Sequence, residues 1–412
     1  MVDKIVITGM GTVNPLGKSV EESWNNTLEG RSGIAPITLF DASQGSVGIA
    51  GEVKDFQALD YMPAKEARRR DRYQQLASAA ALEAIEHSGL EVEEGREGRV
   101  GVIVSSAIGG LQSISDNIKI MNDKGVRKVS PFIIPQLMGD GAAGLIAIDN
   151  NFQGPSFSVT SACASGADGI GIAKMLIESG VIDAAVAGGC EATVTMVGIA
   201  AFDRLGALSR REEYPPNTPQ PFDKNRDGLV VGEGAAALVL ERESHAKSRG
   251  AVILAELAGY GSTADAYHIT APSENGIGGA KAIKIALDDA QLNIEEVGYI
   301  SAHGTATQLN DVSETRAIKA AFGEQAYKIP VSSTKSMTGH MMGATGALEV
   351  IFCVQAMRDG VLPATINYET PDPECDLDYI PNTAREVKIT SAVSNAFGFG
   401  GHNAVLVVKE YS

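Results

Sequence analysis

One cysteine and two histidines in this chain have the surroundings expected of a thiol-based active site. Cys163 follows an apolar stretch and precedes apolar residues at helical spacing, which places it at a strand-to-helix junction near the helix N-terminus. The positive end of a helix dipole favours thiolate, so we expect the pKa of Cys163 to be lowered and its sulfur to be nucleophilic. His303 and His340 lie in glycine-flanked segments and are the imidazoles that could serve it.

A lone cysteine is more often a small buried hydrophobe, and a lone histidine is more often structural. The combination with further motifs reverses this expectation. The segment 301–307 carries His303 between a short strand and a helix, at the carboxyl end of a strand where α/β proteins place ligands. Glu349 is a lone carboxylate on an apolar helix, and Lys335 is its natural partner, because a buried carboxylate needs one. The glycine-rich segment 394–403 allows backbone N–H groups to point into a site, as an oxyanion hole requires.

Short apolar, β-branched segments alternate along the chain with segments of helical spacing. This alternation predicts an α/β fold with mainly parallel, buried strands. The predicted strands are 5–8, 100–105, 156–160, 184–188, 236–240, 254–260, 299–301, 389–394 and 404–408. The predicted helices are 20–28, 64–88, 164–179, 277–290, 311–321 and 346–357.

A boundary near residue 250 would divide the chain into two halves, 1–250 with the cysteine and 251–412 with the histidines. Each half has βαβ character, although no strong sequence repeat relates them. The proline-rich segment 203–227 predicts a long loop, and the segment 112–137, which lacks a clean period, is interpreted as an insertion.

The composition is that of a globular protein: 412 residues, 44% of them hydrophobic, which is ample for a large core. No apolar run is long enough to span a bilayer, and the N-terminus predicts a strand rather than a signal peptide, so we expect a cytoplasmic location. Four scattered cysteines suggest neither a zinc site nor a disulfide framework; they are Cys163, Cys190, Cys353 and Cys375.

A net charge of −17 argues against nucleic-acid binding as the main activity. Two basic clusters nevertheless occur, at 65–70 and 127–128. They are either solvated surface or a docking patch for an acidic partner.

Two segments resemble known binding loops but lack residues that those loops require. Five residues, not four, separate Gly11 from Gly17, and Pro15 removes a backbone donor, so this is not a phosphate-binding loop. The calcium-loop-like start at Asp223 has Gly234 at position twelve, where a bidentate Glu is required. Classical nicotinamide-cofactor and zinc-protease motifs are also missing from the sequence.

Taken in order, the segments of interest resemble those of the β-ketoacyl-acyl carrier protein synthases over essentially the whole chain. The matching segments are 6–11, 162–166, 221–234, 303–305, 335–340 and 395–401. The segment 105–110, with the bulky Ile108, is similar to the elongating type II enzymes of fatty-acid synthesis. The resemblance implies a thiolase-like fold, with two pseudo-symmetric α/β halves in five α-β-α-β-α layers, and a homodimer.

The resemblance also implies a decarboxylative Claisen condensation. Cys163 would accept an acyl chain from acyl carrier protein, with the N–H groups of Cys163 and Phe399 as the oxyanion hole. His303 and His340 would then stabilise malonyl-carrier protein as it loses CO2. Lys335 and Glu349 would support the histidines, and Phe399 would act as a gate. No metal or organic cofactor is implied.

Further residues acquire roles only through this resemblance. Those expected to contact the substrate are Ile108, which would form a wall of the acyl pocket, Phe202, Thr270, Thr305, Thr307, Phe397 and Gly398. Those expected to meet the acidic carrier protein are Lys65, Arg68, Arg69, Arg127 and Lys128. The family often has a further basic residue where this chain has Gly206, which leaves the third part of the docking patch open.

Other members of this fold fit the motifs less well. A thiolase needs a second catalytic cysteine near the C-terminus, where this chain has Phe397 to Gly401, and initiating synthases pair cysteine with one His and one Asn. A silent chain-length partner lacks the nucleophile, and an acyl hydrolase leaves the second histidine unexplained. A polyketide ketosynthase subunit, which uses the same Cys-His-His set, is the alternative that stays open.

Overall fold

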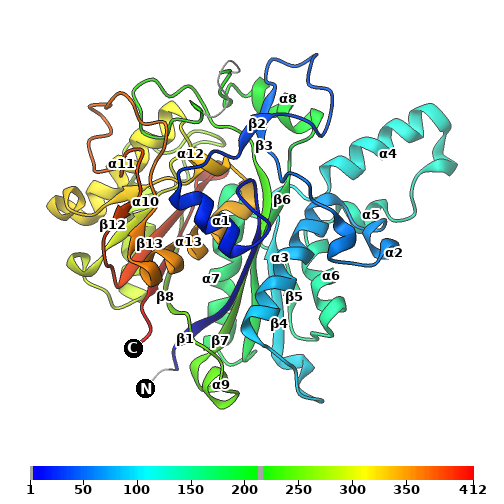
Figure 1. The fold of residues 1–412 in the computed structure, drawn as a ribbon, viewed down its shortest axis with the longest axis horizontal. Helices are drawn as coiled ribbons and strands as arrows, with labels where there is room; N and C mark the ends of the chain where they lie inside the picture. Colours follow the sequence, from blue (N-terminus) through cyan, green and yellow to red (C-terminus); the bar gives the residue numbers. More distant parts are fainter. Residues whose placement is uncertain (1–2, 212–216) are drawn as a thin grey trace.

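The computed structural model describes residues 3–211 and 217–412 and contains one large mixed sheet with helices on its faces (Figure 1). The first five strands of this sheet are β1 (Ile5–Val13), β4 (Val100–Ser105), β5 (Ser156–Phe157), β6 (Ala184–Ala192) and β7 (Glu233–Arg242). The other five are β8 (Ala255–Ala264), β9 (Tyr299–Ser301), β10 (Val331–Ser332), β13 (Ser391–Gly398) and β14 (His402–Lys409). Two small sheets are formed by β2 (Ile34–Pro36) with β3 (Ile49–Gly51) and by β11 (Val361–Leu362) with β12 (Arg385–Glu386).

The strand order reveals an internal duplication. The sheet runs β10-β9-β13-β14-β8-β1-β7-β6-β4-β5, so each half places its own strands in the order third, second, fourth, fifth, first. Within the described part of the sheet, the two halves pair through β1 and β8, at Val6 and Ile7. The predicted fold class, two pseudo-symmetric α/β halves, is therefore confirmed.

The prediction of mainly parallel strands holds only in part. In each half four strands run in one direction, while the fifth, β7 or β14, is antiparallel to its neighbours. The short turn Phe399–Gly401 between β13 and β14 explains the second case, because a parallel neighbour would need a long crossover.

Helices divide the structure into layers (Figure 1). The central helices α7 (Ser165–Glu178) and α13 (Thr345–Asp359) pack between the two halves of the sheet. Helices α3 (Arg72–Ser88) and α6 (Gly141–Asn150) cover the outer face of the N-terminal half, and α10 (Ile277–Asp289) and α11 (Gln308–Phe322) cover that of the C-terminal half. The three large apolar clusters follow this arrangement, one central and one under each outer pair.

The remaining helices are shorter or peripheral: α1 (Val20–Leu28), α2 (Ala64–Ala67), α4 (Leu111–Lys124), α5 (Ile133–Leu137), α8 (Met196–Arg204), α9 (Glu243–Ser248) and α12 (Lys335–Thr338). The predicted helix 64–88 is broken, because Asp71 caps α3 through a capping box with Gln74 and ends the preceding turn. The stretch interpreted as an insertion forms α4 and α5, and α4 projects from the body as an arm (Figure 1).

The described part of the predicted loop 203–227 is irregular after Arg204, with isolated bridges at Leu208 and Asp223. Residues 212–216 of that loop lie outside the described residues. Within the described ranges, none of the helices combines the length and apolar character needed to cross a bilayer.

Candidate active site

The nucleophile candidate lies on a tight turn directly before α7. Cys163 is in the 3-10 turn Ala162–Ala164 and is 8% exposed. Ala162 has a φ of 52°, a left-handed conformation that costs a non-glycine residue of order 1–2 kcal/mol. The hydroxyl of Ser165 stabilises the turn, because it donates to the Ala162 carbonyl at 2.6 Å and accepts the Ser161 N–H at 3.0 Å. The sulfur is thereby held at the helix N-terminus, as the sequence predicts.

The prediction of a lowered thiol pKa is wrong. Burial raises the pKa of Cys163 to about 11, and the Lys335 ammonium and the backbone N–H groups of Phe399 and Cys163 oppose this rise without cancelling it. Desolvation of the thiolate outweighs the helix N-terminus here. The resting nucleophile is therefore a thiol, and its proton has to leave during the reaction.

Two imidazole rings face this sulfur. The Sγ atom of Cys163 and one ring nitrogen of each histidine, His303 and His340, all lie within 4.8 Å of one another. The two imidazole rings meet edge-on, with 5.3 Å between their centroids. The sequence places these residues up to 177 positions apart, and the duplicated fold brings them together.

Glycines allow this close approach. A Cβ at Gly166 of α7 or Gly189 of β6 would lie 2.4 Å or 2.1 Å from the carbonyl oxygen of Gly343. Only hydrogen at both positions lets the turn after His340 pack against α7 and β6. The glycines thus set the distance between the histidine and the cysteine.

The tautomer of His340 follows from its backbone contact. The Met342 N–H donates to His340 Nδ1 at 3.2 Å, so in the neutral ring the proton must be on Nε2. His340 Nε2 is buried and has no partner among the described residues. An N–H donor without an acceptor in a buried site is poised to bind an oxygen of a substrate.

His303 is held through its backbone. The N–H groups of His303 and Gly304 both donate to the carboxylate of Glu314 at 2.7 Å, and Asn395 Nδ2 donates to the same group at 3.1 Å. Glu314 therefore fixes the loop that carries the imidazole. Sequence reasoning missed this residue, because its helix also carries Asp311 and Arg316, so that Glu314 does not stand out as Glu349 does on its apolar helix.

Both imidazoles are neutral at physiological pH. Burial lowers the pKa of His303 and of His340 well below the ordinary value, and the Lys335 ammonium lowers both further. A neutral ring can donate one hydrogen bond without first losing a proton, which suits a donor to a developing oxyanion.

The same trio is a poor metal site. Zinc would need His340 to ligate through Nε2 with a proton on Nδ1, and metal-bound histidines donate that proton to an acceptor. Here the Met342 N–H already points at Nδ1, and the Lys335 ammonium disfavours a second cation. The donor set thus fits acid–base and hydrogen-bond chemistry better than metal ligation.

Lys335 and Glu349 form a fully buried ion pair behind the histidines. The Lys335 Nζ donates to Glu349 Oε1 at 2.6 Å, and each side chain is about 1% exposed. Burial raises the pKa of Glu349 to about 7 even with this cation beside it. The pair predicted from the sequence is present, and its Lys335 ammonium lowers the pKa of Cys163 and of both imidazoles.

The backbone around Gly398 has the geometry of an oxyanion hole. A Cβ at Gly398 would lie 2.8 Å from the Ser161 oxygen and 3.0 Å from the Cys163 nitrogen. The Phe399 N–H and the Cys163 N–H both act on the sulfur. These two N–H groups are the candidate oxyanion donors, and the missing side chain of Gly398 lets β13 pack against the turn that carries Cys163.

A narrow cavity of about 70 Å³ opens onto the sulfur. Six of the predicted substrate-contacting residues line it, namely Phe202, Thr270, Thr305, Thr307, Phe397 and Gly398, together with Cys163, both histidines and Phe399. The ring of Phe399 lies 6.5 Å from that of Phe202. Ile108 is 39% exposed and does not line the cavity.

Seven further lining residues were not predicted: Leu229, Asp265, Pro272, Asn310, Met342, Gly401 and Asn403. Asp265 accepts the Asn403 amide at 2.8 Å and donates its backbone N–H to Gly401. No local motif marked this contact, because its members come from separate strands.

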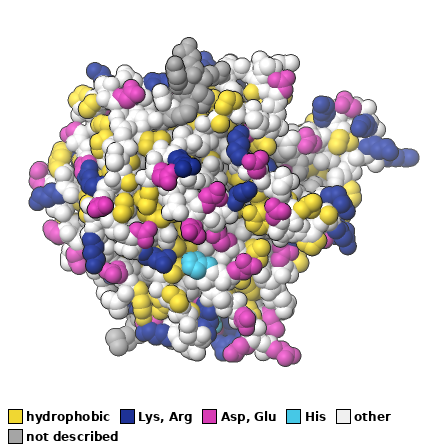
Figure 2. Space-filling view, viewed as in Figure 1, with side chains coloured by type: hydrophobic (Ala, Val, Ile, Leu, Met, Phe, Trp, Pro, Cys, Tyr) yellow, Lys and Arg dark blue, Asp and Glu magenta, His cyan; other side chains and the backbone are white. Residues whose placement is uncertain are grey.

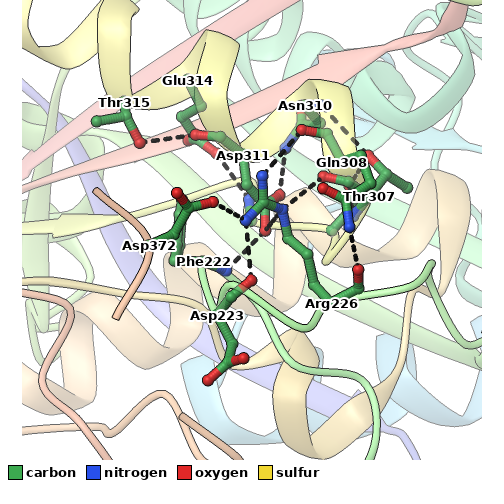
Figure 3. A network of polar contacts seen from close by, with 12 residues as sticks. Phe222, Asp223, Arg226, Thr307, Gln308, Asn310, Asp311, Glu314, Thr315 and Asp372 are labelled. Carbon is green, nitrogen blue, oxygen red and sulfur yellow. Dashed lines mark hydrogen bonds and ion pairs between the residues drawn. The ribbon is translucent and has the colours of Figure 1, made fainter. Parts of the chain in front are cut away.

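A buried arginine organises the threonine wall of the cavity (Figure 3). Arg226 donates to the carbonyl oxygens of Thr307 and Gln308 at 3.2 and 3.0 Å and to the Asp372 carboxylate at 2.6 Å. Asp311 lies 3.8 Å from the same guanidinium and accepts the Phe222 N–H. The segment rejected as a calcium loop thus supplies the arginine that holds Thr307, whose hydroxyl contacts that of Thr305 at 3.0 Å.

The predicted docking residues lie at one end of the molecule. Lys65, Arg68, Arg127 and Lys128 are exposed, whereas Arg69 is half-buried against Glu66 and the Phe132 ring. Arg70 of the same basic run is buried and bound to Asp149, so it is not available for docking. Figure 2 shows basic side chains along the projecting arm, where Lys119 and Lys124 are also exposed.

Comparisons with known proteins agree over the whole chain. Residues 2–246 match the model of the β-ketoacyl synthase N-terminal domain, and residues 254–369 match that of the C-terminal domain. The chain is 46% identical to a Synechocystis protein and 47% identical to a Staphylococcus aureus protein, both named 3-oxoacyl-[acyl-carrier-protein] synthase 2. Each alignment covers 99% of this chain and 98% of the relative.

Solved ketosynthase structures also superpose on the whole chain. A type II polyketide ketosynthase determined with its acyl-carrier protein superposes with a TM-score of 0.93 at 35% identity, over 100% of both chains. A β-ketoacyl synthase from Burkholderia phymatum superposes with a TM-score of 0.92 at 36% identity, again over 100% of both.

Proposed function

The chain belongs to the β-ketoacyl synthase family, and we propose that it is the 3-oxoacyl-[acyl-carrier-protein] synthase that elongates acyl chains in type II fatty-acid synthesis. The observation that carries the proposal is the site itself: one thiol faces a pair of backbone N–H donors on one side and two neutral imidazoles on the other.

In the first half-reaction Cys163 attacks the thioester carbon of an acyl-carrier protein. A bond forms between Sγ and that carbon, the bond to the carrier's sulfur breaks, and the thiol proton ends on the departing carrier thiol. The carbonyl oxygen becomes negative in the tetrahedral intermediate, and the N–H groups of Cys163 and Phe399 stabilise it. Gly398 allows the strand that carries Phe399 to approach the Cys163 turn closely enough to place both donors beside the sulfur.

In the second half-reaction malonyl-carrier protein loses CO2. The electron pair of the broken C–C bond moves toward the thioester oxygen, where His340 Nε2–H and the His303 ring donate hydrogen bonds. The resulting carbanion attacks the acyl-Cys163 carbon, a new C–C bond forms, the bond from that carbon to Sγ breaks, and the thiolate takes up a proton from solvent. No step requires a metal or organic cofactor, because the thioester and the loss of CO2 supply the driving force.

The remaining predicted residues take supporting roles in the proposal. The Lys335 ammonium keeps the imidazoles neutral, Glu349 holds that ammonium in place, and Thr305 and Thr307 contact the substrate arm. Phe399, whose ring adjoins the cavity and Phe202, separates the two half-reactions as a gate.

Partners are part of the proposal. The relative solved with its acyl-carrier protein supports a carrier protein as partner, and the exposed basic residues of α2 and of the arm suit docking of an acidic one. We also propose a homodimer, supported by the position of β5 at the edge of the sheet and by the exposed apolar residue Ile148 on α6, which packs against β5. The cytoplasmic location and the division at residue 250 remain predictions.

A polyketide ketosynthase is the second candidate, favoured by the structural similarity to the type II polyketide ketosynthase and to the ishigamide ketosynthase/chain length factor. Their identities of 35% and 37% are lower than the 46–47% to the fatty-acid enzymes, which favours the first candidate.

Separating the half-reactions tests the proposal. Cys163→Gln, whose amide resembles an acylated site, should release CO2 from malonyl-carrier protein without forming an acyl-enzyme. His303→Ala should lose decarboxylation more than acylation. If Cys163→Gln releases no CO2, or if His303→Ala blocks only acylation, the assigned roles are wrong.

A further inference from the structure

Glu191 is a buried carboxyl group that the reaction steps above do not use. It lies near the end of β6, is 0% exposed, and forms no ion pair with any Lys or Arg of the described ranges. Burial raises its pKa to about 7. Burying a carboxyl group without a paired cation lowers the stability of the fold, so we asked what this side chain contributes.

The carboxylate joins two backbone segments. Its Oε1 accepts the Ser106 hydroxyl at 2.9 Å, and its Oε2 accepts the N–H groups of Ala107 at 2.9 Å and Gly343 at 3.2 Å. Ser106 Oγ in turn accepts the Gly109 N–H at 2.8 Å. Glu191 therefore fixes the loop 105–110 to the turn that follows His340.

Both segments border the apolar side of the nucleophile. Ala107 and Phe202 pack against the buried cluster that contains Cys163, Val194, Ile199 and Met342. Met342 immediately precedes Gly343, and its side chain also lines the cavity. The other side of the sulfur is polar, with His303 and His340. A hydrocarbon chain bound to Sγ must extend toward the apolar side.

We propose that Glu191 is a positioning residue for the acyl chain: by holding the Ala107 and Gly343 peptides together, it fixes the apolar wall and sets which chain lengths Cys163 accepts. The proposal rests on the proposed function, since it requires an acyl-Cys163 intermediate. Its specific consequence is that loss of the carboxylate changes chain-length selectivity more than malonyl decarboxylation, because His340 keeps its own contact with the Met342 N–H.

Glu191→Gln tests this with Glu83→Gln as the matched control. Glu83, like Glu191, is a carboxyl whose pKa is raised by burial and which accepts two backbone N–H groups, those of Thr12 and Val20 at 2.8 Å. It is only partly buried, and it lies on α3, outside the cavity lining. Each variant is assayed for acylation by butyryl- and myristoyl-carrier protein and for decarboxylation of malonyl-carrier protein.

For Glu191→Gln we expect the ratio of myristoyl to butyryl kcat/KM to change about tenfold, the size of one lost hydrogen bond, while decarboxylation stays within about threefold of wild type. Glu83→Gln should leave the ratio unchanged. An unchanged ratio in Glu191→Gln, or an equal change in Glu83→Gln, overturns the proposal. So does a loss of decarboxylation as large as the change in acylation. If the wild-type enzyme forms no acyl-Cys163, the proposed function fails instead.

Two further variants keep the test decisive if Glu191→Gln folds poorly. Ser106→Ala removes one donor of the same network without touching the carboxylate, and it should shift the ratio in the same direction by a smaller factor. Glu191→Ala leaves both N–H groups unpaired and should shift it more than Gln does. A Glu191→Ala enzyme with the wild-type ratio contradicts the positioning role.

Discussion

Gly398→Ala tests the oxyanion hole without removing any functional group. The φ and ψ of Gly398 are −116° and 158°, which alanine adopts without strain, so the change acts only through the added methyl. That methyl would lie 3.0 Å from the Cys163 nitrogen and 2.8 Å from the Ser161 oxygen, distances at which backbone atoms must shift. The shift would displace the Cys163 N–H, one of the two proposed oxyanion donors.

The expected loss follows from blocking one backbone donor. Removing a single oxyanion-hole donor lowers kcat by about 10² to 10³, or roughly 2.7–4 kcal/mol. We expect the rate of Cys163 acylation, followed by intact-protein mass spectrometry in quenched samples, to fall by about this factor. Malonyl decarboxylation should fall by less than about fivefold, because its oxygen is held by the imidazoles and not by these N–H groups.

Gly144→Ala is the matched control, since a Cβ there, in α6, meets nothing within 4 Å. It should acylate at the wild-type rate. Acylation of Gly398→Ala within about threefold of wild type would refute the assignment of the hole, because one blocked donor should cost far more. An equal loss of acylation and decarboxylation would show general damage to the site.

Three other outcomes follow from the same structure. Burial raises the pKa of the Cys163 thiol to about 11, so its alkylation by iodoacetamide should rise about tenfold per pH unit from pH 7.5 to 10, and a plateau below pH 9 would contradict this. Lys335→Met removes the charge that lowers the pKa of Cys163 and of both histidines; alkylation at fixed pH should therefore slow, and faster alkylation would be the wrong sign. The double variant Lys65→Glu with Arg68→Glu should raise KM for carrier-bound substrate several-fold at low salt and leave KM for pantetheine thioesters unchanged. Charge reversal at the exposed Lys281 on α10 should leave both KM values unchanged.

Local patterns predicted the elements that carry strong periodicity or sharp boundaries. The strands 100–105 and 299–301 and the helix 20–28 coincide with β4, β9 and α1. The helix 64–88 was divided in the structure because the capping box at Asp71 begins a new helix, a contact between side chain and backbone that the apolar spacing does not record.

The internal duplication could not be predicted in this way. It depends on strand pairings between distant segments, such as β1 with β7, and the two-residue strands β5 and β10 carry almost no pattern of their own. The arm α4 has too few buried residues to show a period, since Asn117 is the one buried side chain of that helix.

Within the site, motifs identified the cysteine, the histidines and the Lys335–Glu349 pair, and the structure brings them together. The thiol pKa was predicted with the wrong sign, because the depth of Cys163, which decides the desolvation cost, is a property of the assembled fold. Glu314, Arg226 and Glu191 were overlooked although each is a charged residue in buried surroundings.

The most direct test of the account is the fate of an acyl group on Cys163. Intact-protein and peptide mass spectrometry after incubation with a medium-chain acyl-carrier protein should show one acyl group, located on Cys163. Malonyl-carrier protein should then discharge it, with formation of a 3-ketoacyl product two carbons longer. A stable adduct that malonyl-carrier protein cannot discharge, or an acyl group on another residue, would contradict the proposed condensation.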